Sequence, residues 1–126
     1  MLRVLVVDDS SDTAETMRVL LEMWGHEPVI ARDGAAAIRA AVDSCPDVVL
    51  LDLALGPGPD GYEVARHVRR LARSQPVIIC VSGYGRDEDR RRACEAGCDH
   101  HLLKPADPDA VAQLLRSIGA AVAPAL

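Results

Sequence analysis

Aromatic residues are scarce in this sequence, whose 126 residues include no Phe, one Trp and two Tyr. Proteins that bind single-stranded nucleic acid without sequence preference stack bases on aromatic rings, and this sequence offers no such platform. The net charge of −5 also opposes a general nucleic-acid-binding surface. We therefore expect no direct binding to nucleic acid, and a core packed by Val, Leu, Ile and Ala.

Long apolar runs are absent as well. No segment approaches the roughly 20 apolar residues that a membrane-spanning helix needs. Residues 1–7 enter a short apolar run and show no signal-peptide pattern. The sequence thus predicts a cytoplasmic protein with no membrane partner, and its length fits one domain with one core.

Cysteine is sparse and shows no paired spacing. The four cysteines, Cys45, Cys80, Cys94 and Cys98, include no CxxC pair and are too few for a disulfide scaffold. We expect buried free thiols. Cys94 and Cys98 lie four residues apart at the end of an expected helix, but this spacing alone does not favour a metal or redox role.

Two local clusters of charged and histidine residues have plain structural interpretations. The three arginines at 90–92 adjoin acidic residues at 87–89 on an expected helix, which predicts a solvated face with internal ion pairs. His100 and His101 are neighbours on an expected strand, where successive side chains point to opposite faces. They are therefore not expected to bind one metal ion together.

Apolar runs of strand length alternate with helix-length segments along the whole chain. The runs cover residues 4–7, 27–31, 48–51, 77–81 and 101–103. Several are continuous in Val, Leu and Ile, as expected for parallel strands covered on both faces. Helix caps are predicted at Ser11 or Asp12 and at Asp107 before Pro108, and two further helices are expected to open at Asp33-Gly34 and Asp60-Gly61. This pattern predicts a doubly wound (βα)₅ α/β domain.

Polar residues follow four of the expected strands. Asp8 and Asp9 follow the first, Asp52 the third, Ser82 the fourth and Lys104 the fifth. Ligands bind at the carboxyl ends of such strands, so these side chains should converge. Carboxylates at about 4 Å repel by roughly 4 kcal/mol per pair at an effective dielectric of 20. The three acids therefore need a cation, and an oxygen-only ligand set suits Mg²⁺.

Phosphoryl transfer is the chemistry that such a site favours, because it depends mostly on positioning and charge neutralisation. Asp52 would be the nucleophile, forming an aspartyl phosphate. Lys104 would draw charge from the phosphoryl oxygens, and the Ser82 hydroxyl would donate a hydrogen bond to one of them.

Five segments together resemble the response-regulator receiver family of two-component signalling, and in particular the receivers of hybrid histidine kinases. They read VLVVDD at 4–9, VVLLDL at 48–53, DGYEV at 60–64, SGYG at 82–85 and AGCDHHLLKP at 96–105. The similarity runs over residues 2–119. It implies a flavodoxin-like fold with strand order 2-1-3-4-5, a receiver domain over residues 1–121 and a disordered tail over 122–126.

The resemblance also implies roles for individual residues. Asp52 is the phosphoacceptor. Asp9 and Asp52 bind Mg²⁺ directly, Asp8 binds it through water, and the main-chain carbonyl of Ala54 is a further ligand. Ser82 and Lys104 bind the phosphoryl group, and the peptide bond before Pro105 is cis in the family.

Several positions depart from the family pattern. His101 stands where the family has an aromatic switch residue, and an imidazole at this position can still report the state of the site. Gly83 stands where Ala is common, and the loop at 55–60 is one residue longer than usual. Ala54 and Tyr84 occupy positions that tune dephosphorylation, and neither carries a carboxylate or amide. We therefore expect a long-lived phosphorylated state.

The resemblance places the chain in signalling rather than in metabolism. A histidine kinase or a histidine phosphotransfer domain would supply the phosphoryl group, and the domain would catalyse its own phosphorylation and dephosphorylation. The output would be a switched protein contact or an output domain outside this chain. Two alternatives remain: a phosphatase of the haloacid-dehalogenase type, which places its nucleophile after the first strand, and a degenerate receiver that serves only as an interaction module.

Overall fold

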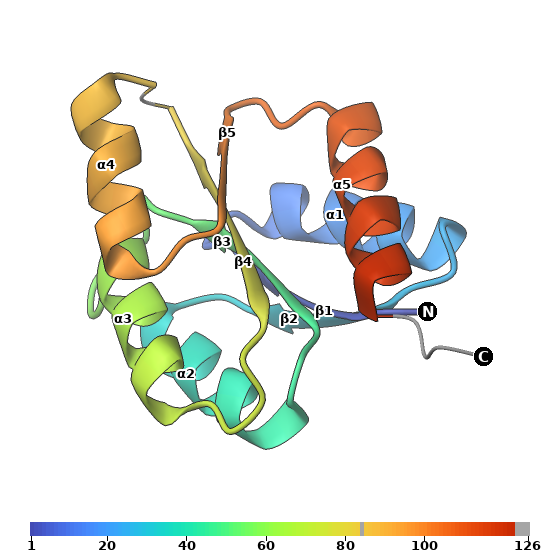
Figure 1. Ribbon diagram of the computed structural model, residues 1–126, viewed down its shortest axis with the longest axis horizontal. Coiled ribbons are helices and arrows are strands. Elements are labelled where there is room, and N and C mark those ends of the chain that lie inside the picture. The colour runs from blue at the N-terminus through green and yellow to red at the C-terminus, as the bar shows by residue number, and fades with distance from the viewer. Residues whose placement is uncertain (84, 123–126) are drawn as a thin grey trace.

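Five parallel strands form one sheet in this computed structural model, which describes residues 1–83 and 85–122 (Figure 1). The strands are β1 (Arg3–Val7), β2 (Glu27–Ala31), β3 (Val48–Asp52), β4 (Val77–Ser82) and β5 (His100–Leu103). Their order is β2-β1-β3-β4-β5. The predicted (βα)₅ architecture and strand order are thus confirmed, and β1 and β3 lie side by side at the centre.

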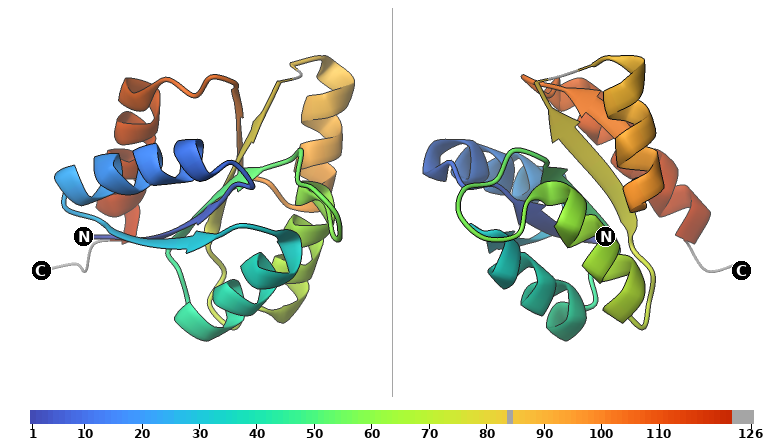
Figure 2. Two further views of the ribbon diagram at one scale, coloured as in Figure 1. Left: turned by 180° about the vertical axis from the view of Figure 1, so that it is seen from behind. Right: turned by 90° about the vertical axis from the view of Figure 1, so that its left-hand side faces the viewer.

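Helices cover both faces of the sheet (Figure 2). They are α1 (Ser11–Met23), α2 (Gly34–Ser44), α3 (Gly61–Leu71), α4 (Asp87–Ala96) and α5 (Pro108–Val122). One core lies between the sheet and α2, α3 and α4, and the other between the sheet and α1 and α5. Both cores are built from Val, Leu, Ile and Ala with almost no aromatic residues, as the composition requires.

Side-chain caps fix where the helices begin. Asp33 accepts a hydrogen bond from Ala36 N–H at 2.7 Å, and Asp60 accepts one from Glu63 N–H at 2.9 Å, so α2 and α3 begin where the sequence predicted. The prediction for α1 was wrong, because its cap is Ser10 and not Ser11 or Asp12. Asp8 Oδ1 accepts a hydrogen bond from Ser10 N–H at 2.9 Å, which turns the chain directly after β1.

The last helix is also the longest, with 15 residues from Pro108 to Val122. Asp107 Oδ1 accepts a hydrogen bond from Asp109 N–H at 3.0 Å at its start. Val122, which we assigned to the tail, belongs to this helix, and residues 123–126 lie outside the described part of the chain. Among residues 1–83 and 85–122, no helix is long and apolar enough to cross a membrane.

The expectation of buried free thiols was wrong. Cys80 and Cys98 are joined by a disulfide bond, while Cys45 and Cys94 are free and exposed. Cys80 lies on β4, and Cys98 lies in the turn between α4 and β5, the strand that pairs with β4. Their Cα atoms are 6.2 Å apart, within the usual range for a disulfide. Strand pairing, which sequence spacing does not reveal, brings the two cysteines together.

The arginine cluster on α4 is exposed, as predicted, but its predicted ion pairs are not found. The ion pairs of the described residues lie elsewhere and do not involve Arg90, Arg91 or Arg92. Arg92 instead lies over the ring of Tyr62 on α3, with its guanidinium carbon 3.9 Å from the ring centre. A cation–π contact between helices thus replaces pairing within one helix.

Candidate functional site

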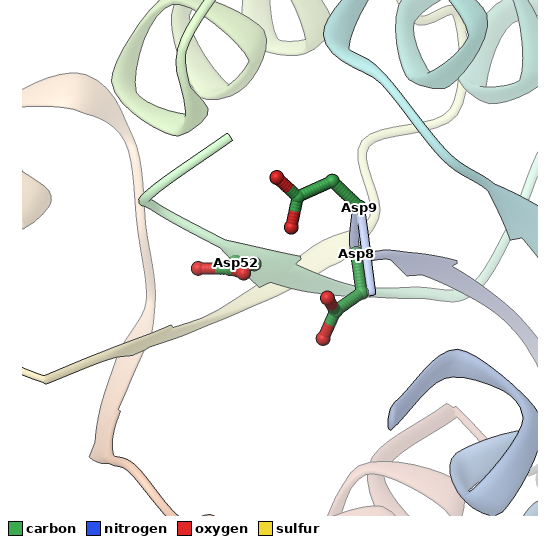
Figure 3. Close-up of side chains that lie close together, drawn as sticks. All are labelled: Asp8, Asp9 and Asp52. Atoms are coloured by element: carbon green, nitrogen blue, oxygen red, sulfur yellow. The ribbon is translucent and has the colours of Figure 1, made fainter. Parts of the chain in front are cut away.

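Three carboxylates meet where β1 and β3 end (Figure 3). Asp8 and Asp9 follow β1, and Asp52 is the last residue of β3. Val7 pairs with Leu51 in the sheet, so the residues that follow these two lie next to each other. One oxygen from each carboxylate lies within 4.8 Å of the others. The predicted convergence of the three acids is confirmed.

Burial differs among the three acids. Asp8 and Asp52 are 8% and 4% exposed, whereas Asp9 is open to solvent. Burial raises the pKa of Asp8, the hydrogen bond from Ser10 N–H opposes this rise, and the nearby charge of Asp52 adds to it. The site therefore holds more negative charge than its surroundings favour.

Lys104 places a positive charge directly against Asp52. Its Nζ lies 2.9 Å from Asp52 Oδ1, which also accepts a hydrogen bond from Ala54 N–H at 2.9 Å. The Lys104 main-chain N–H donates to the Ser82 carbonyl at 2.8 Å, and the Lys104–Pro105 peptide bond is cis. The end of β4 thereby holds the segment from which Lys104 reaches Asp52.

A cavity of about 530 Å³ opens at the carboxylates. Asp8, Asp9, Asp52, Ala54 and Lys104 line its polar part. Its walls continue between α1 and α5, where apolar side chains line it: Met17, Leu20, Pro108 and Val111. The cavity thus gives the acids access to solvent next to an apolar wall.

The loop between β3 and α3 lies against both the acids and the start of α2. A Cβ atom added to Gly34 would lie 2.3 Å from the Pro59 carbonyl oxygen, so the loop packs tightly on α2. A Cβ added to Gly56 would lie 3.5 Å from Asp9 Oδ2. The loop at 55–60 therefore borders the site at Gly56.

Arg32 is a neighbour of the site that we did not predict. Its guanidinium donates to the Asp9 carbonyl oxygen at 3.2 Å and to Ser11 Oγ at 2.8 Å, across the loop that carries the acids. Arg32 directly follows β2, so applying the strand-end rule to the second strand would have found it.

Ser82 and His101 form a pair beside the acids. Ser82 Oγ and His101 Nε2 are 2.8 Å apart in a hydrogen bond, and Ser82 is 4% exposed. Neither residue is among those that line the cavity. Tyr84, the second position expected to tune dephosphorylation, lies outside the described residues.

Comparison with known proteins identifies the family of this fold. The family model of the response regulator receiver domain matches residues 4–116. The chain belongs to this family. The receiver is 32% identical to the phosphate regulon transcriptional regulatory protein PhoB of Escherichia coli strain K12, over 97% of this chain and 53% of PhoB. It is 39% identical to the transcriptional regulatory protein PrrA of Mycobacterium tuberculosis, over 82% of this chain and 43% of PrrA.

Solved receivers have the same fold. A two-component response regulator of the LuxR family from Aurantimonas sp. SI85-9A1 superposes with a TM-score of 0.84 at 32% identity, covering 96% of this chain and 86% of that chain. The receiver spans about half the length of the curated relatives it matches, 53% of PhoB and 43% of PrrA.

Proposed function

We propose that this receiver accepts a phosphoryl group on Asp52 in a Mg²⁺-dependent reaction. The observation that carries the proposal is the 2.9 Å contact of Lys104 Nζ with Asp52 Oδ1 beside two further carboxylates. The three ionised carboxylates carry −3, Lys104 brings the sum to −2, and one divalent cation would neutralise it. Such a site favours the entry of an anionic phosphoryl group once the cation is bound.

The donor atoms at this edge fit Mg²⁺, which prefers carboxylate, carbonyl and water oxygens. Asp9, Asp52 and the main-chain carbonyl of Ala54 would hold the ion directly, and Asp8 would do so through water. When bound, Mg²⁺ neutralises charge on the phosphoryl oxygens. The raised pKa of the buried Asp8 supports a cation site, because a cation would offset the charge that burial disfavours.

Asp52 is the nucleophile in this proposal. Lys104 Nζ and the Ala54 N–H both bind its Oδ1, and Oδ2 would attack phosphorus. An O–P bond forms while the P–N bond of a phosphohistidine breaks, and the leaving imidazole takes up a proton from solvent. Lys104 and the Ser82 hydroxyl then bind phosphoryl oxygens.

The phosphohistidine belongs to a histidine kinase or a histidine phosphotransfer domain, which places the receiver in the cytoplasm. It is a signalling domain that catalyses its own phosphorylation and dephosphorylation. Phosphorylation shifts the segment at 86–118 between two packings, a coupling generally worth about 1–3 kcal/mol or roughly 5–150-fold in partner affinity. The output is a protein contact, or an output domain in a longer chain.

The competing functions differ in what they require of Asp52. A haloacid-dehalogenase phosphatase places its nucleophile after the first strand, whereas Asp52 ends β3. A degenerate receiver would not need Lys104 in contact with Asp52. In this protein the contact is present. The labelling experiment below separates an active receiver from a degenerate one.

Acetyl phosphate with Mg²⁺ is expected to add one phosphoryl group to the wild-type protein, detected by intact mass. The Asp52→Asn variant should gain none, because the amide is not a nucleophile, and chelation of Mg²⁺ should prevent labelling of the wild type. Asp43→Asn, an exposed acid on α2, is the matched control and should label normally. A mass gain retained by Asp52→Asn would move the acceptor elsewhere.

The phosphorylated receiver is expected to persist for many minutes after acetyl phosphate is removed. Ala54 is exposed beside the acceptor and carries no group to orient an attacking water. Decay of the phosphorylated mass with time measures the lifetime, and Ala54→Asn should shorten it because an amide can hold a water in place. A wild-type half-life of only seconds would contradict this expectation.

A further inference from the structure

A hydrogen bond joins Ser82, at the end of β4, to His101 on β5. Ser82 ends β4 and is buried, and His101 is half-buried on β5, the strand that pairs with β4 (Figure 1). Their side chains meet at 2.8 Å through Ser82 Oγ and His101 Nε2. The same serine accepts the Lys104 N–H at its carbonyl, so it touches both the imidazole and the lysine segment.

The other ring nitrogen indicates which partner is the donor. His101 Nδ1 is buried and has no hydrogen-bond partner among the described residues. Burying an N–H donor without an acceptor costs more free energy than burying an unprotonated ring nitrogen without a donor. The neutral tautomer with the proton on Nε2 is therefore favoured, and His101 donates its Nε2–H to Ser82 Oγ. The serine's own hydroxyl proton is then not used in this bond.

We propose that His101 is a positioning residue whose neutral imidazole donates to Ser82 Oγ and thereby holds the Ser82 hydroxyl as a donor toward a phosphoryl oxygen on Asp52. This inference rests on the proposed phosphorylation of Asp52. Ser82 lies one position beyond Val81, the sheet partner of Asp52, so its side chain belongs to the strand next to the acceptor. Because Ser82 Oγ already accepts a hydrogen bond from His101, its side chain loses less conformational freedom when it binds the phosphoryl group.

Protonation of His101 works against this arrangement. An imidazolium would carry a second N–H on the buried Nδ1, where the described residues offer no acceptor. Burial lowers the pKa of His101, the positive charge of Arg90 lowers it further, and the negative charge of Asp89 opposes both. Arg90 and Asp89, both on α4, are the charged groups that act on it. Acid therefore favours an imidazole turned out to solvent, which releases Ser82.

The test compares rates of acetyl phosphate labelling at Asp52, with saturating Mg²⁺, from pH 5.5 to pH 8. His101→Leu keeps the bulk and removes the donor, and it should label about three- to tenfold more slowly at pH 8, as expected for one lost hydrogen bond. His101→Gln can place an amide N–H near the position of Nε2 and does not titrate. It should label close to the wild-type rate at pH 8 and lose the decline that the wild type shows in acid.

Ser82→Ala completes the comparison, because a positioning residue acts only through the residue it positions. On the Ser82→Ala background, His101→Leu should cause no further slowing. Equal slowing by His101→Leu with and without Ser82 would overturn the proposal, as would an acid decline that persists in His101→Gln. If His101→Leu does not fold, as judged by circular dichroism, the pH profiles of His101→Gln and Ser82→Ala decide the same question.

The outcomes also separate this inference from the proposed function. Labelling that survives Asp52→Asn overturns the acceptor assignment. Labelling confined to Asp52 but unaffected by His101→Leu leaves the acceptor in place and removes only the role of His101.

Discussion

Replacing Gly61 with alanine is expected to lower the free energy of unfolding by about 2–3 kcal/mol, at the upper end for overpacking a buried position. A Cβ atom there would lie 2.4 Å from Leu53 Cα and 2.6 Å from the Asp52 carbonyl oxygen. Both are main-chain atoms at the end of β3, so the clash is relieved only if the strand or α3 moves. Urea denaturation followed by circular dichroism measures the change.

Gly83→Ala is the matched control for this prediction. A Cβ on Gly83 meets no atom within 4 Å, so the variant should stay within about 0.5 kcal/mol of the wild type. Because the Gly61 substitution pushes on the backbone of Asp52, it should also slow labelling at Asp52 in the fraction that remains folded. Equal unfolding midpoints for the two variants would mean that the close approach of Gly61 to β3 does not constrain the fold.

The sequence could predict the fold because several of its strands are short, continuous apolar runs. The run from Val48 to Leu51 is apolar at every position and short, as expected for a parallel strand buried on both faces. Once parallel strands are placed, the carboxyl ends share one edge, and Asp52 must lie near Asp8 and Asp9. The acid cluster therefore follows from topology, without knowledge of any side-chain conformation.

Contacts between elements could not be predicted in this way. The Cys80–Cys98 disulfide depends on the turn between α4 and β5 passing beside β4, and the contact of Arg92 with Tyr62 depends on how α4 packs on α3. Neither geometry has a signal in local spacing. Patterns within one element, such as the acidic and basic run on α4, favoured local pairing that tertiary packing replaced.

The contact between Ser82 and His101 could be predicted only in part. Sequence reasoning placed Ser82 at the end of the fourth strand and His101 at the start of the fifth, and noted that His101 replaces an aromatic residue. It could not show that the imidazole meets Ser82, because the direction of a side chain depends on tertiary packing. A substitution in a family pattern marks where to look, and the contact has to come from the structure.

Asp8→Asn is expected to change the stability of the receiver in opposite directions with and without Mg²⁺. Without the ion, the variant should be more stable than the wild type at neutral pH by about 1 kcal/mol, the usual scale for one substitution. The physical reason is that burial raises the pKa of Asp8, so the wild-type fold is destabilised as the pH rises through that raised pKa. An asparagine can still accept the hydrogen bond from Ser10 N–H without carrying the charge.

Mg²⁺ should reverse the order of the two proteins. A ligand at 100 times its Kd adds about 2.7 kcal/mol to the free energy of unfolding, and the wild type should gain this amount. Asp8→Asn should lose most of the gain, because the amide lacks the charge that attracts the ion. Urea denaturation in chelator and in saturating Mg²⁺ measures both effects, with the exposed Asp43→Asn as the control that should behave as the wild type. A variant that is less stable without the ion and equally stabilised by it would show that Asp8 serves the fold rather than a metal site.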